Sequence, residues 1–207
     1  MHRIFLGIIV LLMAGCGKPQ PPSVAAVASC PPELDAVAAF MRLNYGENAS
    51  KNMPIVIEDT FSIAMLESSF GSHKRFTEEL AKYASADIPA ELIRDFCDKN
   101  SGEEKVWSDL GKWIPVVLLS RAEKEMLFLE EQKWRADGWE RFYAKYPDSP
   151  GIITISRVGF SSSGDLAMLY VGCGSGIRSG AGHIRVLRKR DGKWYELNII
   201  IGPAWVS

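Results

Sequence analysis

The sequence predicts an α+β fold in which a mainly helical segment, residues 30–150, packs on an antiparallel β-meander of about four strands, residues 151–207. Two observations support this fold class. Apolar residues recur mostly at helical spacing before residue 150, and after it β-rich runs alternate with turn residues. The length of this region, about 175 residues, suits a single domain with an adequate core.

The first elements follow from apolar spacing. Residues 34–45 place apolar side chains on one helical face, and Gly46 is expected to end this helix. The apolar residues 55–57 predict a short strand. Further helices are expected over residues 73–83 and from Pro89 to about residue 100, where polar residues and glycine end the apolar pattern.

A second strand and a capped helix come next. Residues 113–119 predict a strand, and Pro115 places it at an edge or a bend of the sheet because proline cannot donate a ladder hydrogen bond. Ser120 and Glu123 form a capping-box pattern, in which each side chain satisfies a backbone donor of the other residue. We therefore expect a helix over residues 121–134.

An aromatic helix closes the first part of the domain. The Asp137-Gly138 pair is expected to interrupt the preceding helix. Residues 139–146 then carry Trp139, Phe142, Tyr143 and Tyr146 on one face. This spacing favours packing against the sheet over an aromatic shelf for a ligand.

Four β-rich runs follow, over residues 152–161, 166–173, 183–190 and 194–201. Asp191-Gly192 is a strong hairpin signal between the last two runs. The glycine-rich segment 172–182 is interpreted as a loop or bulged connection. A phosphate-binding role for it is disfavoured because no helix follows. The helices are expected to cover one face of this meander.

The N-terminus has the layout of a lipoprotein signal, residues 1–15. Arg3 precedes the apolar run 4–12, which is shorter than the about 20 residues that a membrane-spanning helix needs. The lipobox-like sequence Met13-Ala14-Gly15 leads to Cys16, whose thiol would carry the diacylglycerol, so lipidation is assigned to Cys16. Residues 16–29 are rich in proline and small residues and predict a tether.

Composition predicts where the protein resides and narrows its partners. The absence of an aspartate after Cys16 favours the outer membrane facing the periplasm, so the membrane is one expected partner, with an envelope protein or other envelope component as another. Residues 30–150 carry a net charge of −7 and residues 151–207 one of +4. This asymmetry favours attraction between the two parts of the fold over an anionic partner, and nucleic acid is not expected.

Cys30, Cys97 and Cys173 remain after lipidation of Cys16. Cys30 precedes one predicted helix and Cys97 ends another, so a disulfide is predicted between them in an oxidising compartment. Cys173 lies in a strand pattern and is interpreted as a small buried hydrophobic residue. With two distant histidines in the mature chain, no metal site and no cofactor are expected.

Motif and spacing distinguish the catalytic from the binding candidates. Ser161, Asp165 and His183 have the residue types of a hydrolytic triad, but the second glycine of a nucleophile elbow is missing, so turn roles are favoured. The candidate binding residues are Arg178, His183 and Arg188. Alternation along a strand does not place the arginines of residues 178–190 in one patch.

The C-terminal third resembles a widespread family of uncharacterised bacterial exported proteins and lipoproteins. The resemblance covers about the last 70 residues and rests on WERFY (139–143), YPDSPGI (146–152), SRVGF (156–160), AMLYV (167–171), GAG (180–182), LRK (187–189), GKW (192–194) and WVS (205–207), with fainter matches at IVIEDT (55–60) and DFCDKN (95–100). The resemblance implies export and a shared sheet, and it assigns no activity.

Together these patterns predict a membrane-anchored lipoprotein whose domain is a binding or interaction module without catalysis. An envelope or extracellular hydrolase is the alternative, motivated by Ser161, Cys173 and His183. A small-ligand pocket between the helices and the sheet is a third possibility.

Overall fold

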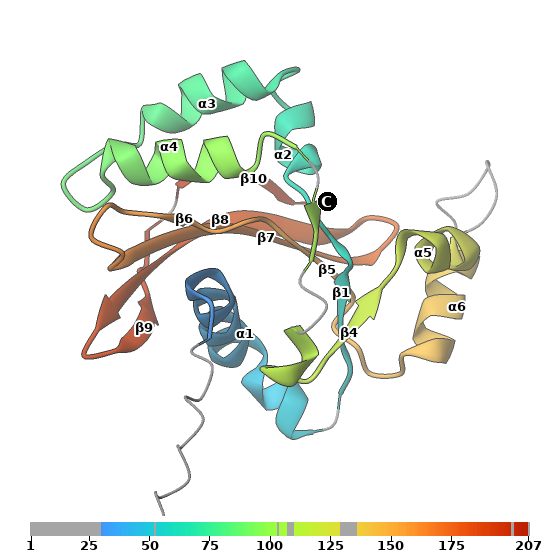
Figure 1. The fold of residues 1–207 in the computed structure, drawn as a ribbon. Coiled ribbons are helices and arrows are strands. Elements are labelled where there is room, and N and C mark those ends of the chain that lie inside the picture. The colour runs from blue at the N-terminus through green and yellow to red at the C-terminus, as the bar shows by residue number, and fades with distance from the viewer. Residues whose placement is uncertain are drawn as a thin grey trace, which may run out of the picture.

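The computed structural model describes residues 30–51, 53–102, 104–106, 110–128, 136–199 and 201–206, and it has an α+β fold (Figure 1). The helices are α1 (Pro32–Ser50), α2 (Ala64–Ser68), α3 (His73–Ala81), α4 (Ala90–Lys99), η1 (Leu110–Lys112), α5 (Arg121–Leu127) and α6 (Ala136–Lys145). The strands are β1 (Ile55–Glu58), β2 (Thr60–Phe61), β3 (Glu104–Lys105), β4 (Val116–Leu119), β5 (Ile152–Ile155), β6 (Gly159–Phe160), β7 (Leu166–Gly176), β8 (Ser179–Arg190), β9 (Lys193–Glu196) and β10 (Ile201–Val206).

One large mixed sheet organises the domain, with strand order β10-β8-β7-β5-β1-β4. β6 also pairs with β7 and β9 with β8, and β2 and β3 form a separate pair. The antiparallel meander of β7, β8 and β9 confirms the predicted C-terminal sheet. The expectation of about four strands was too small, because β1 and β4 of the N-terminal part join the same sheet, and β1 runs parallel to both β4 and β5.

β1 explains why the sheet extends into the N-terminal part. Its residues Ile55, Val56 and Ile57 are each at most 2% exposed, so the strand is buried on both faces. An interior parallel strand needs such a continuous apolar run. β4 beside it is the last strand of the sheet path, as the prediction of an edge strand after Pro115 required.

Helices cover both faces of the sheet, rather than the one face that was expected (Figure 1). Face one, the side on which α1 packs, carries Ile55, Ile57 and Ile153. Face two carries one cluster beneath α3 and α4, with Met168 and Tyr170 of β7, and a second cluster beneath α6. The alternation of side chains along each strand produces this division.

The glycine-rich segment 172–182 is mostly paired strand with a register shift between Gly174 and Gly176, which agrees with the bulged connection and not with the loop. β7 runs to Gly176 and β8 begins at Ser179, so only a two-residue turn separates them. A Cβ atom on Gly172 would lie 2.5 Å from the Tyr170 hydroxyl oxygen. Gly172 is therefore explained by the space that the Tyr170 ring occupies. It does not interrupt the pairing of β7 with its neighbouring strands.

Two helix boundaries also differ from the predictions. α1 continues through Gly46 to Ser50, so this glycine does not end the helix. α6 begins at Ala136 and includes the Asp137-Gly138 pair. A Cβ atom on Gly138 would lie 2.6 Å from the Phe128 ring, so Gly138 permits close packing inside the helix. Of the predicted helix 121–134, residues 121–127 form α5, and residues 129–134 lie outside the described ranges.

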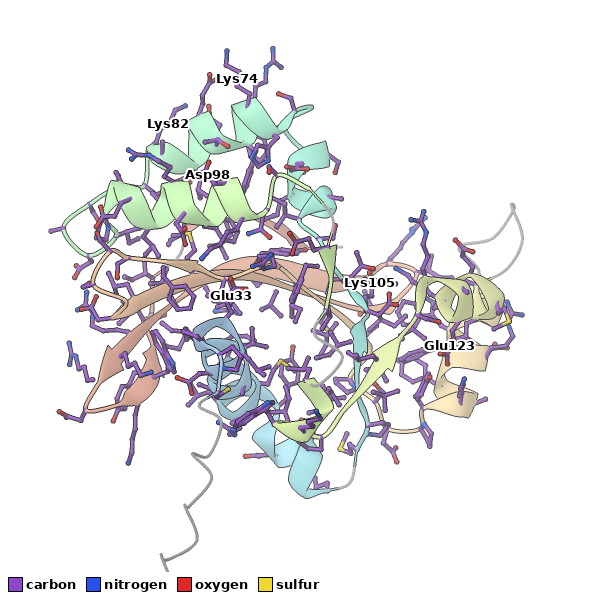
Figure 2. All side chains as sticks on the ribbon, in the orientation of Figure 1. Glu33, Lys74, Lys82, Asp98, Lys105 and Glu123 are labelled. Atoms are coloured by element: carbon purple, nitrogen blue, oxygen red, sulfur yellow. The ribbon has the colours of Figure 1, made fainter. Side chains whose placement is uncertain are left out.

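Half of the predicted capping box is present at α5. The Ser120 hydroxyl accepts a hydrogen bond from the Glu123 backbone N–H at 3.2 Å. The Glu123 carboxylate instead pairs with Lys145 and accepts a hydrogen bond from the Tyr146 hydroxyl at 2.6 Å. Figure 2 shows Glu123 between α5 and α6, and the hydrogen bonds from Lys145 and Tyr146 lower its pKa.

Several basic residues of the C-terminal part pair with acids of the N-terminal part, which supports attraction within the fold. Arg157 Nε lies 2.8 Å from Glu33 Oε2 at the start of α1, and Arg157 also pairs with Glu104. Lys189 pairs with Asp35 at 2.8 Å and Arg188 with Asp87 at 3.3 Å. These pairs connect the C-terminal part to α1 on face one and to the connection between α3 and α4 on face two.

The segment 156–160 joins the sheet to α4. Asn100, at the C-terminal end of α4, donates to the Arg157 carbonyl at 3.1 Å and accepts from the Arg157 N–H at 2.9 Å. The Phe160 N–H donates to the Asp95 carboxylate at 2.7 Å. A Cβ atom on Gly159 would lie 2.5 Å from the Phe96 nitrogen, so the strand and the helix are in backbone contact.

Candidate functional site

The corner between α2 and α3 is the main candidate site. Gly71 has a φ of +74°, which glycine adopts readily, and this lets the chain turn between the two helices. Ser72 then caps α3, because its hydroxyl accepts a hydrogen bond from the Arg75 N–H at 3.3 Å. α3 and α4 pack on each other over face two, with Phe76 and Leu80 buried beneath α3.

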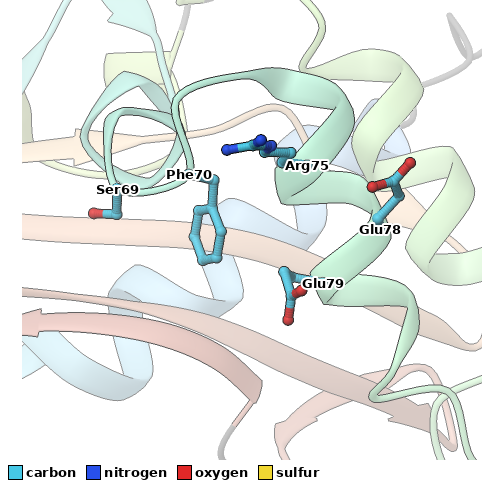
Figure 3. Close-up of a pocket in the computed structure, with 5 residues that line it drawn as sticks. All are labelled: Ser69, Phe70, Arg75, Glu78 and Glu79. Atoms are coloured by element: carbon cyan, nitrogen blue, oxygen red, sulfur yellow. The ribbon is translucent and has the colours of Figure 1, made fainter.

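A recess of about 460 Å³ opens at this corner (Figure 3). It is lined by Ser69, Phe70, Arg75, Glu78 and Glu79. Phe70 is half-buried and packs against the core cluster of face two, and its ring centroid lies 5.9 Å from that of Phe76. Packing against Phe76 and the core cluster therefore restricts the motion of the Phe70 side chain.

The charges of the recess are unequally compensated. Glu79 pairs with Lys82 at 2.5 Å, and Glu78 lies 3.9 Å from Lys74. Both lysines project from α3 away from the sheet (Figure 2). Within the described part of the chain, the Arg75 guanidinium forms no ion pair. Figure 3 shows it reaching from α3 towards Phe70.

A second recess, of about 100 Å³, lies between α2 and the end of α4. Glu67, which lines it, accepts a hydrogen bond from His73 Nδ1 when this nitrogen is protonated. An acid and the histidine that it orients are two of the three members of a hydrolytic triad, and the third is a nucleophile. The neighbouring Cys97 thiol is 1% exposed, and burial raises its pKa, so it is a poor nucleophile.

The predicted binding residues Arg178, His183 and Arg188 lie at three separate places. Arg178 lies in the exposed turn between β7 and β8. His183 is opposite Val171 and shares face one with it, whereas Arg188 is opposite Leu166 of face two. The three residues therefore do not form one site, because odd and even positions of β8 face opposite sides of the sheet, as strand alternation led us to expect for the arginines.

The imagined triad does not assemble either. The Ser161 hydroxyl donates to the Asp165 carboxylate at 3.0 Å and accepts from the Leu166 N–H at 3.0 Å, which is a turn arrangement. His183 is paired with Val171, which lies five positions beyond Leu166 along β7. His183 is therefore about 17 Å along the strand from the end at which Ser161 lies. Ser161 and Asp165 thus shape the hairpin between β6 and β7.

Cys173, Tyr45 and His183 lie near one end of face one. The Cys173 thiol donates to the Pro150 carbonyl at 3.7 Å, and burial raises its pKa. Burial likewise raises the pKa of Tyr45 to about 12. Burial and the neighbouring Arg185 lower the pKa of His183. At neutral pH these three side chains are uncharged, which fits the interpretation of Cys173 as a small hydrophobic residue.

The predicted disulfide between Cys30 and Cys97 is wrong. Cys30 packs against the core cluster of face one, and Cys97 is buried in the cluster of face two. The sheet lies between them, whereas the two Cα atoms of a disulfide are normally within about 7 Å. The prediction rested on the position of each cysteine next to a helix end. Such a position does not specify on which face of the sheet the cysteine lies.

Phe70 and Arg75 were missed because no motif marks them. Gly71-Ser72 signals a turn and a helix start, but the recess depends on how the end of α2 and α3 are placed relative to each other. The predicted lipidation site Cys16 and the tether lie outside the described residues. The described residues contain no cluster of three or more His, Cys, Asp or Glu side chains arranged to hold a metal ion.

Within the described ranges, every helix is too short or too polar to be a membrane span. No protein-family model matches the chain, and comparisons with curated proteins and with solved structures give no significant match.

Proposed function

We propose that the chain is an envelope lipoprotein, anchored through a diacylglycerol on Cys16, whose α+β domain binds a protein or other envelope component without catalysis. The observation that supports the binding role is the recess at the α2–α3 corner. There the Phe70 ring, which packs on the core, lies beside the Arg75 guanidinium, which forms no ion pair with the described residues. Aromatic and arginine side chains are the commonest anchors of binding surfaces.

The anchor rests on the lipobox-like sequence before Cys16 and on the tether 16–29. Two or three acyl chains suffice for stable anchoring. Such a tether would let the domain meet a partner at the membrane surface. We propose the outer membrane, on its periplasmic side, as the location.

Fatty-acid labelling in a bacterial host tests the anchor. The unaltered chain is expected to incorporate an alkyne-bearing palmitate analogue and to sediment with membranes. Cys16→Ser should abolish both properties, and Cys30→Ser is the matched control that should retain them. Labelling that survives Cys16→Ser contradicts the anchor.

Site-specific photo-crosslinking in cells tests the binding role. A photo-reactive phenylalanine analogue at position 78, in the recess, is expected to give a discrete crosslinked product that weakens when Phe70→Ala is added. The same analogue at position 193, an exposed site on β9, is the control. Equal yields of the crosslinked product from positions 78 and 193 would contradict binding at the recess. Stoichiometric labelling of Ser161 or Cys173 by serine- or cysteine-directed activity probes would contradict a non-catalytic role.

A further inference from the structure

The recess has two chemically different sides. Figure 3 shows the Arg75 side chain reaching from α3 towards Phe70, so the guanidinium lies beside this residue, whereas Ser69 lies on its other side. Glu78 and Glu79 lie farther along α3, and both have lysine partners. The uncompensated positive charge in the described lining is therefore on the Arg75 side.

A guanidinium presents a planar set of N–H donors that matches the two oxygens of a carboxylate. The Phe70 ring beside these donors offers an apolar surface, which is fixed because the ring packs on the core cluster of face two. An anionic group with an adjacent apolar group fits both features.

Glu78 and Glu79 restrict the charge of that ligand. A polyanion that reached across the recess would bring like charges close to these two carboxylates, which disfavours binding. A ligand with a single negative charge avoids this repulsion when its remaining part is neutral or positive. The arrangement therefore favours a monocarboxylate over a polyphosphate.

We infer that this recess binds a single carboxylate next to an apolar side chain, which is the chemistry of a free peptide C-terminus. The inference rests on the proposed binding function and specifies its ligand. Arg75 binds the carboxylate, Phe70 contacts the apolar side chain, and the rest of the peptide runs along α3 past Glu79.

Fluorescence anisotropy with the full-length mature protein in detergent tests the inference. The probe is an N-terminally labelled Ala-Ala-Phe tripeptide, either as the free acid or as the C-terminal amide. The acid is expected to bind at least about tenfold more tightly, because a charge-assisted hydrogen bond to the carboxylate is lost in the amide. Arg75→Gln should remove this preference, whereas Arg94→Gln, at an exposed arginine of α4, should keep it.

Competition separates the sources of the carboxylate. Unlabelled tripeptide acid that displaces the probe more strongly than N-acetylphenylalanine supports a peptide C-terminus, and equal displacement by the two overturns it in favour of a small free acid. Equal binding of acid and amide, a preference that survives Arg75→Gln, or equally strong displacement by pyrophosphate overturns the carboxylate assignment.

The crosslink from position 78 distinguishes failure of this ligand from failure of the proposed function. A recess-specific crosslink that the tripeptide acid does not reduce would leave the binding function in place and refute the ligand class. Loss of specificity in the crosslink itself would refute the function. Circular dichroism of Arg75→Gln and Arg94→Gln verifies that each variant is folded.

Discussion

Replacing Gly159 with alanine is expected to lower the free energy of unfolding by about 3 kcal/mol. The new Cβ atom would lie 2.5 Å from the Phe96 nitrogen and 2.6 Å from its Cα atom. Carbon atoms in contact normally lie about 3.5–4.0 Å apart, so α4 and β6 would have to separate by about 1 Å. Gly159 has no positive φ, so the penalty is steric.

The separation would also strain the hydrogen bond from the Phe160 N–H to Asp95. Urea unfolding of the mature protein, followed by tryptophan fluorescence, measures the effect. Gly46→Ala is the matched control: its Cβ atom would meet nothing within 4 Å inside α1, so this variant should gain about 0.5–1 kcal/mol. A Gly159→Ala variant within about 0.5 kcal/mol of the unaltered protein would refute the close-contact argument.

Three further predictions concern titration and thiols. Burial alone would raise the pKa of Asp35, but hydrogen bonds from Lys189 and Trp194 outweigh it and lower the pKa below 3.8. The ionised carboxylate therefore stabilises the fold above that pH, and stability is lost as the pH falls through the lowered pKa. Asp35→Asn should flatten the pH dependence of the urea midpoint below pH 4, and an unchanged slope would count against this pairing. Burial, with a smaller effect from Arg185, lowers the pKa of His183 from 6.5, so stability is lost as the pH falls from 6.5 through the lowered pKa. His183→Gln should lose less stability than the unaltered protein as the pH falls below 6.5, whereas identical losses would oppose the prediction. Burial raises the pKa of the Cys97 thiol, which should resist alkylation in the native protein and react in urea, and a Cys30–Cys97 peptide in a non-reducing digest would contradict its placement.

Local sequence signals placed most of the elements correctly. The apolar spacing after Pro89 predicted α4, Pro115 predicted an edge strand, and Asp191-Gly192 predicted the turn between β8 and β9. These signals succeed because helix periodicity, a missing backbone donor and a positive-φ turn are properties of adjacent residues.

The errors arose where a residue responds to a distant partner. Gly138 was interpreted as a helix break, although it makes room for the Phe128 ring. For the glycines of β7 and β8 the sequence leaves a loop and a bulged connection open, and Gly172 makes room for Tyr170 within a paired strand. Glycine signals both a turn and a close approach, and one sequence does not distinguish them without the neighbouring ring.

The sequence by itself determined the α+β class, the antiparallel C-terminal meander and the residue types available for chemistry. The tertiary structure decided that β1 and β4 join this sheet, that Cys30 and Cys97 lie on opposite faces, and that Phe70 and Arg75 line one recess. The physical reason is that element type depends on spacing along the chain. The face on which a side chain lies depends on strand register, and the shape of a recess depends on how two helices pack.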